Sequence, residues 1–414
     1  MTTSARWAAV ASVLLAVVSC PAHADDDADL RQIRIPSGRT DLLYSAASDP
    51  ANANTLIVLE TGVYPLTAPL RLQRNQFIRG KNRYAFQYGT PARRPDGGFA
   101  EPDSETILDC TVVTGPGCVF ITQGGASDLT VHGGASNSAL VQVGGPGTSP
   151  PYTVLVRRLD IRGGQRGFRV QLTVGKASVR VEQSVMRDTS GSFSFGWQVQ
   201  LSGIGAPSVD FAIRNSYISG HRYGGFVAGL GNNGTFNVTS QANRYVGNAA
   251  GLALHPGRDA TALTGGTAPG SHGNQLVFIS EADNFIGNGV YPGWNWPHLA
   301  GIVAITAVRS SPASGPHSHN KMWLTVKDPS FTDNRVADIV AYAAVSLDGS
   351  LQGGTPSTEP AGEDNLLFLT LDVGSHTGVF YQCASIPFDP TGTNQVWVSG
   401  PDAGTIVENC AVLQ

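Results

Sequence analysis

The chain has 414 residues, of which 27 are Lys or Arg, 31 are Asp or Glu and 50 are glycine. A net charge of −4 argues against a nucleic-acid-binding protein, which usually presents a basic surface. The length fits two ordinary domains or one long repetitive domain.

Residues 1–24 have the features of an export signal. Arg6 supplies a positive start, residues 7–18 form an apolar stretch too short to span a membrane, and Ala22-His-Ala24 is a small-x-small cleavage site. Cys20 lies in a loose lipobox, so a lipid-anchored form is the alternative to cleavage near Ala24. We therefore predict a secreted or periplasmic protein with no transmembrane segment.

The remaining cysteines predict disulfide bonds. Removal of the signal takes away Arg6 and Cys20, which leaves 26 basic and 31 acidic residues and a net charge of −5. Four cysteines stay behind, and an even number in an exported chain indicates disulfides. Of the three possible connectivities, the simplest pairs neighbours in sequence. The pairs are Cys110 with Cys118 and Cys383 with Cys410.

Residues 25–55 are expected to form an N-terminal cap. Ile33-Arg-Ile-Pro36 has the pattern of a short strand, and residues 39–47 have that of a short helix. A repetitive fold needs such a cap, because bare strand edges invite aggregation. From Leu56 onward, alternating apolar residues predict the first turn of a second domain that covers residues 56–414.

One phrase of sequence recurs along this second domain. Ser240-Gln-Ala-Asn-Arg-Tyr-Val-Gly-Asn248, followed by Gly251-Leu-Ala-Leu-His255, corresponds to Ser280-Glu-Ala-Asp-Asn-Phe-Ile-Gly-Asn288, followed by Gly301-Ile-Val-Ala-Ile305. Weaker copies occur on both sides. The aligned ring or aliphatic positions are Leu159, Val185, Tyr217, Tyr245, Phe285 and Phe331. Such a repeat is typical of a chain that winds in stacked turns.

The repeated unit predicts an all-β, parallel β-helix. Short strands of period two place alternate side chains inside and outside the winding chain. The side chains expected inside are Leu252, Leu254, Ile302 and Ala304, and those expected outside are Ala253 and His255. Asn215, Asn243 and Asp283 at the corners are expected to hydrogen-bond the backbone of adjacent turns. A sandwich of antiparallel sheets is the alternative, but it does not repeat one phrase this often.

The segment Leu56–Gly80 and the turns from Thr106 to about Val398 resemble the pectate-lyase-like right-handed parallel β-helix proteins. The resemblance covers most of the chain and is specific for the fold. It implies a carbohydrate-active protein, because the superfamily includes pectate and alginate lyases, polygalacturonases, uronate epimerases, phage tailspikes and adhesins. Fold alone does not choose among these activities.

Long loops are predicted on both sides of the Gly-φ-x-φ strand. The excursions cover residues 81–104, 256–273, 289–299, 307–319 and 346–364. A strand floor between loop walls forms a groove, where binding residues concentrate. Trp294 and Trp296 on one wall would stack on sugar rings, and the alternative is that they pack inside their own loop. The outward floor positions expected beneath the substrate include Arg169, Gln171, Gln198 and Gln200, and further along Val227, Gly229, Val303, Ile305, Val340 and Tyr342.

The groove turns are poor in carboxylates, which disfavours a hydrolase with two catalytic acids and indicates no calcium site. A uronate lyase or epimerase instead neutralises the substrate carboxylate, removes the C5 proton and protonates the leaving oxygen. We assign neutralisation to Arg222 or Arg258, the base to His255 and the acid to Tyr342 or His298. His255 also precedes a proline at a strand end, so a structural corner role is the alternative.

Together these patterns predict an exported, monomeric protein that binds a polysaccharide or oligosaccharide and needs no cofactor. A requirement for a divalent cation such as calcium is the open alternative. The activity expected is that of a polysaccharide lyase or uronate epimerase on an acidic glycan. The alternative is a non-catalytic carbohydrate-binding or surface-adhesion protein.

Overall fold

The computed structural model describes residues 30–81, 105–134, 139–145, 151–187, 194–258, 270–289, 299–309, 315–335, 337–348, 355–356, 362–372, 381–384, 393–400 and 411–412. The predicted export signal lies outside these residues. In the part that is described, no helix is long and apolar enough to cross a bilayer.

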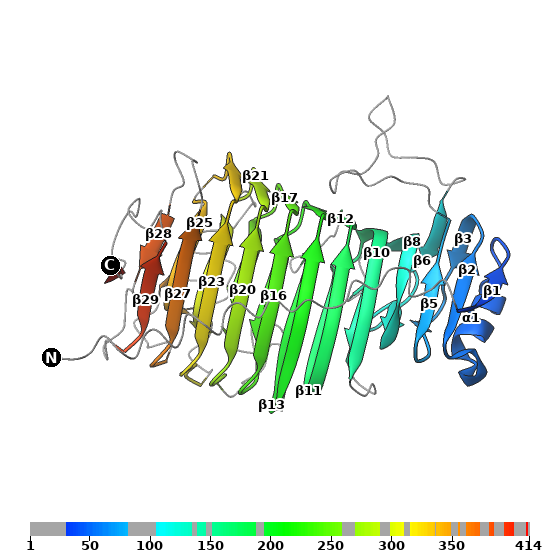
Figure 1. The fold of residues 1–414 in the computed structure, drawn as a ribbon, viewed down its shortest axis with the longest axis horizontal. Coiled ribbons are helices and arrows are strands. Elements are labelled where there is room, and N and C mark those ends of the chain that lie inside the picture. Colours follow the sequence, from blue (N-terminus) through cyan, green and yellow to red (C-terminus); the bar gives the residue numbers. More distant parts are fainter. Residues whose placement is uncertain are drawn as a thin grey trace.

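The chain winds into a right-handed β-helix with three sheets, named A, B and C here (Figure 1). Strands of sheet A run upward at the front of the view while successive turns are added from right to left, and the chain returns through sheets B and C. Consecutive turns pair in parallel, as in the register of Thr235–Gln241 with Gln275–Glu281. The predicted right-handed parallel β-helix is therefore confirmed as the fold.

Sheet A forms the broad front face. It contains β1 (Arg31–Ile35), β2 (Thr55–Leu59), β5 (Gln76–Arg79), β16 (Thr235–Gln241), β20 (Gln275–Glu281), β23 (Lys321–Lys327), β27 (Leu366–Asp372), β29 (Gln395–Ser399) and β30 (Ala411–Val412). Four long strands each contribute to two sheets, namely β8 (Gln123–Gly133), β10 (Tyr152–Gly163), β11 (Arg166–Glu182) and β13 (Phe195–Arg214). Sheet A takes the first parts of β8 and β10 and the last parts of β11 and β13.

Sheets B and C complete each turn. Sheet B contains the ends of β8 and β10 together with β3 (Gly62–Pro65), β6 (Thr106–Asp109), β12 (Val185–Arg187), β14 (Tyr217–Ser219), β17 (Arg244–Val246), β21 (Asn284–Ile286) and β24 (Ser330–Thr332). Sheet C contains the starts of β11 and β13 together with β4 (Leu70–Arg71), β7 (Val119–Ile121), β9 (Val141–Gly144), β15 (Tyr223–Gly229), β18 (Ala250–His255), β19 (Gly257–Arg258), β22 (Ala300–Arg309), β25 (Ile339–Asp348) and β28 (Tyr381–Ala384). A short β26 (Thr355–Pro356) pairs antiparallel with β25.

The N-terminal end of the β-helix carries the expected strand and helix. Strand β1 pairs in parallel with β2, and helix α1 (Thr40–Ser48) follows it, with a short 3-10 turn at Pro50–Asn52. Leu43, Ala46 and Ala47 of α1 join the main core. The helix therefore covers the first turn with apolar side chains, as the sequence predicts.

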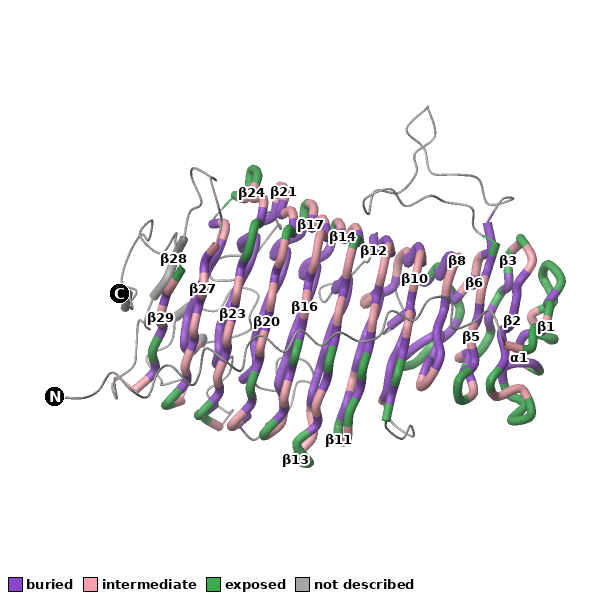
Figure 2. Tube along the Cα trace, viewed as in Figure 1, coloured by how far each residue is buried: buried purple, intermediate pink, exposed green. Residues whose placement is uncertain are grey.

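One continuous hydrophobic core runs inside the winding chain. Figure 2 shows that buried residues recur along successive turns. The alternation predicted for β18 and β22 is confirmed on the inside, because Leu252, Leu254, Ile302 and Ala304 all belong to this core. Ala253 does not, and packs instead in a second buried cluster on the outer face of sheet C.

All three corners of the helix are lined by side chains that hydrogen-bond from turn to turn. Between sheets A and B, the Asn243 amide N–H donates to Asp283 Oδ1 over 2.8 Å, and Ser216 N–H donates to Asn243 Oδ1 over 2.9 Å. The Asn248, Asn288 and Asn334 ladder lies between sheets B and C, and the Asn274, Asn320, Asn365 and Asn394 ladder lies between C and A. The predicted role of Asn243 and Asp283 is confirmed.

The register predicted for the earlier turns is wrong by one residue. Ile218, and not Tyr217, pairs with Tyr245, and Asn215 is not a member of the corner ladder. The reason is that Asn215 adopts the left-handed backbone conformation at the corner (φ 50°), as Ala242 does in the next turn (φ 54°). The ladder position then falls to Ser216, one residue later. The same register places Ile161 and Met186, rather than Leu159 and Val185, in the ring column.

One of the two predicted disulfides is present. Cys110 and Cys118 are bonded and fully buried. Cys410 lies outside the described residues, so its pairing with Cys383 stays a prediction.

Candidate functional site

The candidate site lies on the outer face of sheet C, where the parallel register aligns side chains of successive turns. One column contains Gln142, Arg169, Gln198, Phe226, Ala253, Val303 and Val340. A second column contains Gln171, Gln200, Ala228 and His255. The face is polar over β9, β11 and β13 and becomes aromatic and then aliphatic toward β25.

Phe226 and Ala228 occupy the two outward positions for which the sequence predicts Val227 and Gly229. Val227 is aligned with Leu254 and packs in the main core, so its predicted outward position is wrong. Either Gly224 or Gly225 could align with Gly251, the glycine that begins the repeat in the next turn. In the structure Gly225 pairs with Leu252, so the aligned glycine is Gly224.

The polar part of the face, which we call the polar floor, consists of Gln142, Arg169, Gln198 and Gln200. Gln200 Oε1 accepts hydrogen bonds from Arg169 Nη2 at 3.1 Å and from Gln198 Nε2 at 3.2 Å. Arg169 Nε, Gln142 Oε1 and Gln198 Oε1 are buried and have no hydrogen-bond partner within the described part of the chain. Buried polar atoms without partners are costly and are usually found where they serve a purpose.

The polar floor is also electrically unbalanced. Burial lowers the pKa of Arg169 to about 9, with the positive charge of Arg166 contributing, and burial lowers the pKa of Arg166 to about 10. Among the described residues, no carboxylate forms an ion pair with Arg169. A buried cation in this setting favours an anionic partner.

An aromatic cluster lies in β13 and β15, and one of its rings contacts His255. Phe195, Tyr223 and Phe226 form an aromatic cluster with centroid distances of 5.0 to 5.5 Å. The Arg258 guanidinium lies 5.0 Å from the centroid of Phe226, and the His255 ring meets Phe226 edge to face at 5.5 Å.

His255 and Arg258 are in direct contact, as the sequence assignment requires. Arg258 Nη1 donates to His255 Nδ1 over 3.2 Å, which identifies this nitrogen as an acceptor. Arg222 belongs to the same neighbourhood, because its charge and that of Arg258 oppose the rise in the pKa of Tyr223 that burial causes. Tyr223 is a site residue that the sequence reasoning missed. Tyr223 is aligned with Ala250 of the next turn, and this alignment of the repeats is the feature by which the sequence could have identified it.

The predicted open groove at His255 is wrong. His255, Arg222, Arg258 and Tyr342 are each at most 1% exposed. Ala253, Val303, Ile305 and Val340 around them form a buried outer cluster. Apolar residues on both faces of a strand are typical of parallel sheets covered on both sides, and the uninterrupted run Gly301-Ile-Val-Ala-Ile305 already carries that signal.

The remaining predicted site residues are placed unevenly. Arg169, Gln198 and Gln200 come together in the polar floor and are at least nine-tenths buried, while Gln171 is half-buried beside them. Trp294, Trp296 and His298 lie outside the described residues. In the described ranges, no group of three His, Cys, Asp or Glu side chains is placed to hold a metal ion.

No protein-family model matches the chain. A search of curated proteins also found no match. Among solved structures, the A-modules of two Azotobacter vinelandii mannuronan C-5 epimerases are similar to it. AlgE6 has 14% identity and a TM-score of 0.41 over 91% of this chain and 92% of the other. AlgE4 has 12% identity and a TM-score of 0.40 over 91% and 96%.

A third similar structure is a mannuronic acid specific polysaccharide family 6 lyase from human gut microbiota. It has 10% identity and a TM-score of 0.27 over 86% of this chain and 92% of the other. Similarity at this level carries no conclusion about activity. The parallel turn-to-turn pairing of its own strands establishes that this chain folds as a parallel β-helix.

Proposed function

We propose that the protein is exported and acts on an acidic glycan, as a polysaccharide lyase or uronate epimerase. The observation that supports this function is the polar floor, where Arg169 is a buried cation without a carboxylate partner in the described chain. A uronate carboxylate supplies the missing negative charge, and sugar hydroxyls pair with the half-buried Gln171 beside the polar floor.

The chemical step is proposed for residues other than those of the polar floor. His255 is the candidate base for the C5 proton, and Arg222 or Arg258 is the candidate cation at the carboxylate. All three side chains are buried in the structure, so this step requires the outer face of sheet C to become accessible to the substrate. Tyr342 or His298 is the candidate acid. Elimination and epimerisation both start with loss of the C5 proton, and they differ in whether the leaving oxygen departs or a proton returns to the opposite face.

Activity is tested by incubating a panel of uronate polymers with the protein. A lyase produces an unsaturated sugar that absorbs in the ultraviolet, and an epimerase produces changed sugar signals in NMR spectra. Absence of both products across mannuronate, guluronate and galacturonate polymers would exclude the enzymatic proposal for these substrates.

Arg169→Gln is expected to weaken binding of a uronate oligosaccharide by about 10- to 100-fold, since a hydrogen bond to a charged group contributes roughly 1.5–3 kcal/mol. Isothermal titration calorimetry measures the change. Arg180→Gln is the matched control because Arg180 is a half-buried arginine of the same strand β11, on the outer face of sheet A. Equal loss of affinity in both variants would contradict a specific role for Arg169.

A non-catalytic glycan-binding protein is the second candidate, and the burial of His255 favours it. His255→Ala separates the two functions. Loss of turnover with an unchanged unfolding temperature would support the enzyme. A lower unfolding temperature with unchanged ligand binding would show that His255 only supports Phe226 and Arg258.

A further inference from the structure

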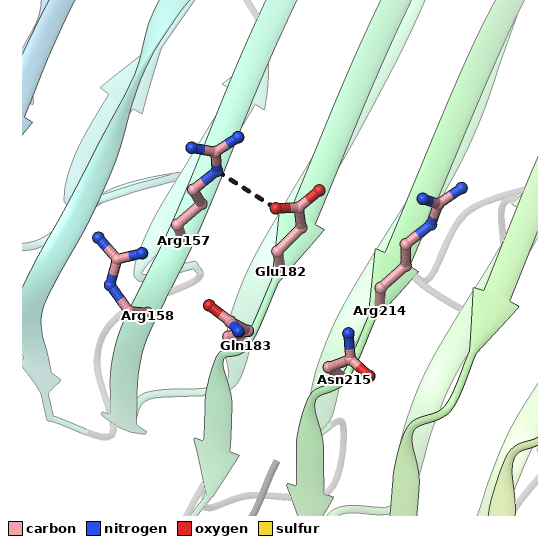
Figure 3. A pocket seen from close by; sticks show the side chains of 6 residues that line it. All are labelled: Arg157, Arg158, Glu182, Gln183, Arg214 and Asn215. Carbon is pink, nitrogen blue, oxygen red and sulfur yellow. Dashed lines mark ion pairs between the residues drawn. The ribbon is translucent and has the colours of Figure 1, made fainter. Parts of the chain in front are cut away.

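A pocket lies at the corner between sheets A and B, away from the outer face of sheet C. It has a volume of about 340 Å³ and is lined by Arg157, Arg158, Glu182, Gln183, Arg214 and Asn215 (Figure 3). In each of three neighbouring turns, they occupy the last outward position on sheet A, in β10, β11 or β13, and the corner position that directly follows it.

The backbone explains why these side chains meet. Arg157, Glu182 and Arg214 are aligned by the parallel register, so their side chains leave the same face of sheet A. Arg158, Gln183 and Asn215 follow them in the left-handed conformation, with φ of 51°, 50° and 50°. The three turns therefore present one charged or polar pair each to the pocket.

Charges in this pocket do not balance. Its lining carries three arginines and one glutamate. Glu182 Oε2 lies 3.2 Å from Arg157 Nε, and Arg158 pairs with Asp128 of the preceding turn at 2.5 and 2.7 Å. Within the described residues, Arg214 has no ion pair, and its buried Nε–H has no hydrogen-bond partner.

Two other groups of charged side chains nearby have partners of opposite charge. Further along the same corner, Glu281 accepts from Gln241 at 3.1 Å and pairs with Lys327 at 2.9 Å. On sheet B, Arg162 and Arg187 share Asp160, and Arg162 also contacts Glu105. The pocket differs from both because it has a surplus of positive charge beside open space and two side-chain amides.

We propose that this pocket is a second binding site for an acidic saccharide, which places a carboxylate or sulfate group against Arg214 and Arg157. Guanidinium groups match both oxyanions in geometry, and the amides of Gln183 and Asn215 suit sugar hydroxyls. A saccharide bound at this corner lies on a different part of the β-helix surface from the outer face of sheet C. The proposal goes beyond the proposed function, because it requires no catalysis.

The test titrates the full mature chain with three oligosaccharides of equal length, namely a uronate, a sulfated and a neutral one. The Arg169→Gln background is used so that the polar floor contributes little. We expect the uronate or the sulfated probe to bind and the neutral probe not to bind. The stronger of the two identifies carboxylate or sulfate as the preferred group, and binding of neither overturns the proposal.

Two substitutions with opposite expected effects make the test specific. Arg214→Gln is expected to weaken binding about tenfold, because it removes a charged hydrogen-bond donor. Glu182→Gln is expected to tighten it severalfold, because it removes the single acid in the pocket. Arg180→Gln removes the same charge two residues before Glu182, on the same face of β11 but outside the lining, and is expected to have little effect.

The results separate this site from the candidate site on sheet C. Arg214→Gln is expected to leave product formation from a short substrate unchanged in the otherwise unaltered chain. Equal weakening by Arg214→Gln and Arg180→Gln would overturn the pocket and indicate only general attraction between opposite charges. Weaker binding in Glu182→Gln would overturn it as well, since that residue would then be a contact and not a repulsive neighbour.

Discussion

Asp283→Asn is expected to raise the free energy of unfolding by about 3 kcal/mol at neutral pH and to leave it almost unchanged below about pH 4. Asp283 is fully buried in the corner ladder, and burial raises the pKa of its carboxyl to about 6. An unfolded aspartate has a pKa of 3.8. Between these values the native state holds a proton that the unfolded state has lost, so stability falls as pH rises through this window.

The geometry of the previous turn indicates that asparagine fits at this position. Asn243 Nδ2 donates to Ser240 Oγ, three residues earlier, over 3.0 Å. Ser280 stands three residues before Asp283 and currently donates to Asp283 Oδ2 over 2.7 Å. In the variant this bond reverses direction, while the side-chain oxygen still accepts from the Asn243 amide.

Urea unfolding of both proteins at several pH values measures the difference. Asp210→Asn is the control, because Asp210 is exposed and the change in charge is the same. We expect the control to change stability by less than about 0.5 kcal/mol. A variant no more stable than the original protein at pH 8 would show that the Asp283 carboxylate is not destabilising.

Gly225→Ala is expected to cost about 3 kcal/mol of stability, because the core has no space for the added methyl group. A Cβ at this position would lie 2.2 Å from Trp197 Cζ2, 2.3 Å from Trp197 Cε2 and 2.7 Å from Leu252 Cδ2. The indole has little room to move, because Trp197 is fully buried, stacks on Phe211 at 5.0 Å and donates to the Tyr245 hydroxyl over 3.4 Å.

A double-mutant cycle with Trp197→Leu tests the contact. The smaller side chain leaves room for the methyl group, so the combined variant is expected to lose less stability than the sum of the two single variants. Additive losses in thermal or urea unfolding would show that the contact with Trp197 is not what excludes a side chain at position 225.

The fold can be predicted from the repeats in the sequence because every turn places the same kinds of residue in the core and at the corners. Leu252, Leu254, Ile302 and Ala304 fill one interior, and Asn243 and Asp283 hydrogen-bond one corner. Register is harder to predict. The left-handed corner needs a backbone conformation and no particular side chain, so Asn215 and Ala242 share a role without a shared residue type.

The site is less visible in the sequence. Periodicity places Arg169, Gln198 and Gln200 on one face correctly, but it does not show what covers that face, and so the burial of His255 was not predicted. The corner pocket is hidden for another reason. Arg157, Glu182 and Arg214 are 25 and 32 residues apart, and only the parallel register brings them together.

The corner ladders also explain how turns of unequal length share one scaffold. Ser216 and Asn243 are 27 residues apart, whereas Asn288 and Asn334 are 46 apart, yet both pairs make the same kind of hydrogen bond. Doubling the length of a flexible connection costs only about 0.6 kcal/mol in closure entropy. The corners therefore act as fixed anchor points between which excursions lengthen, shorten or are exchanged, so new surface chemistry can arise without any change to the interior.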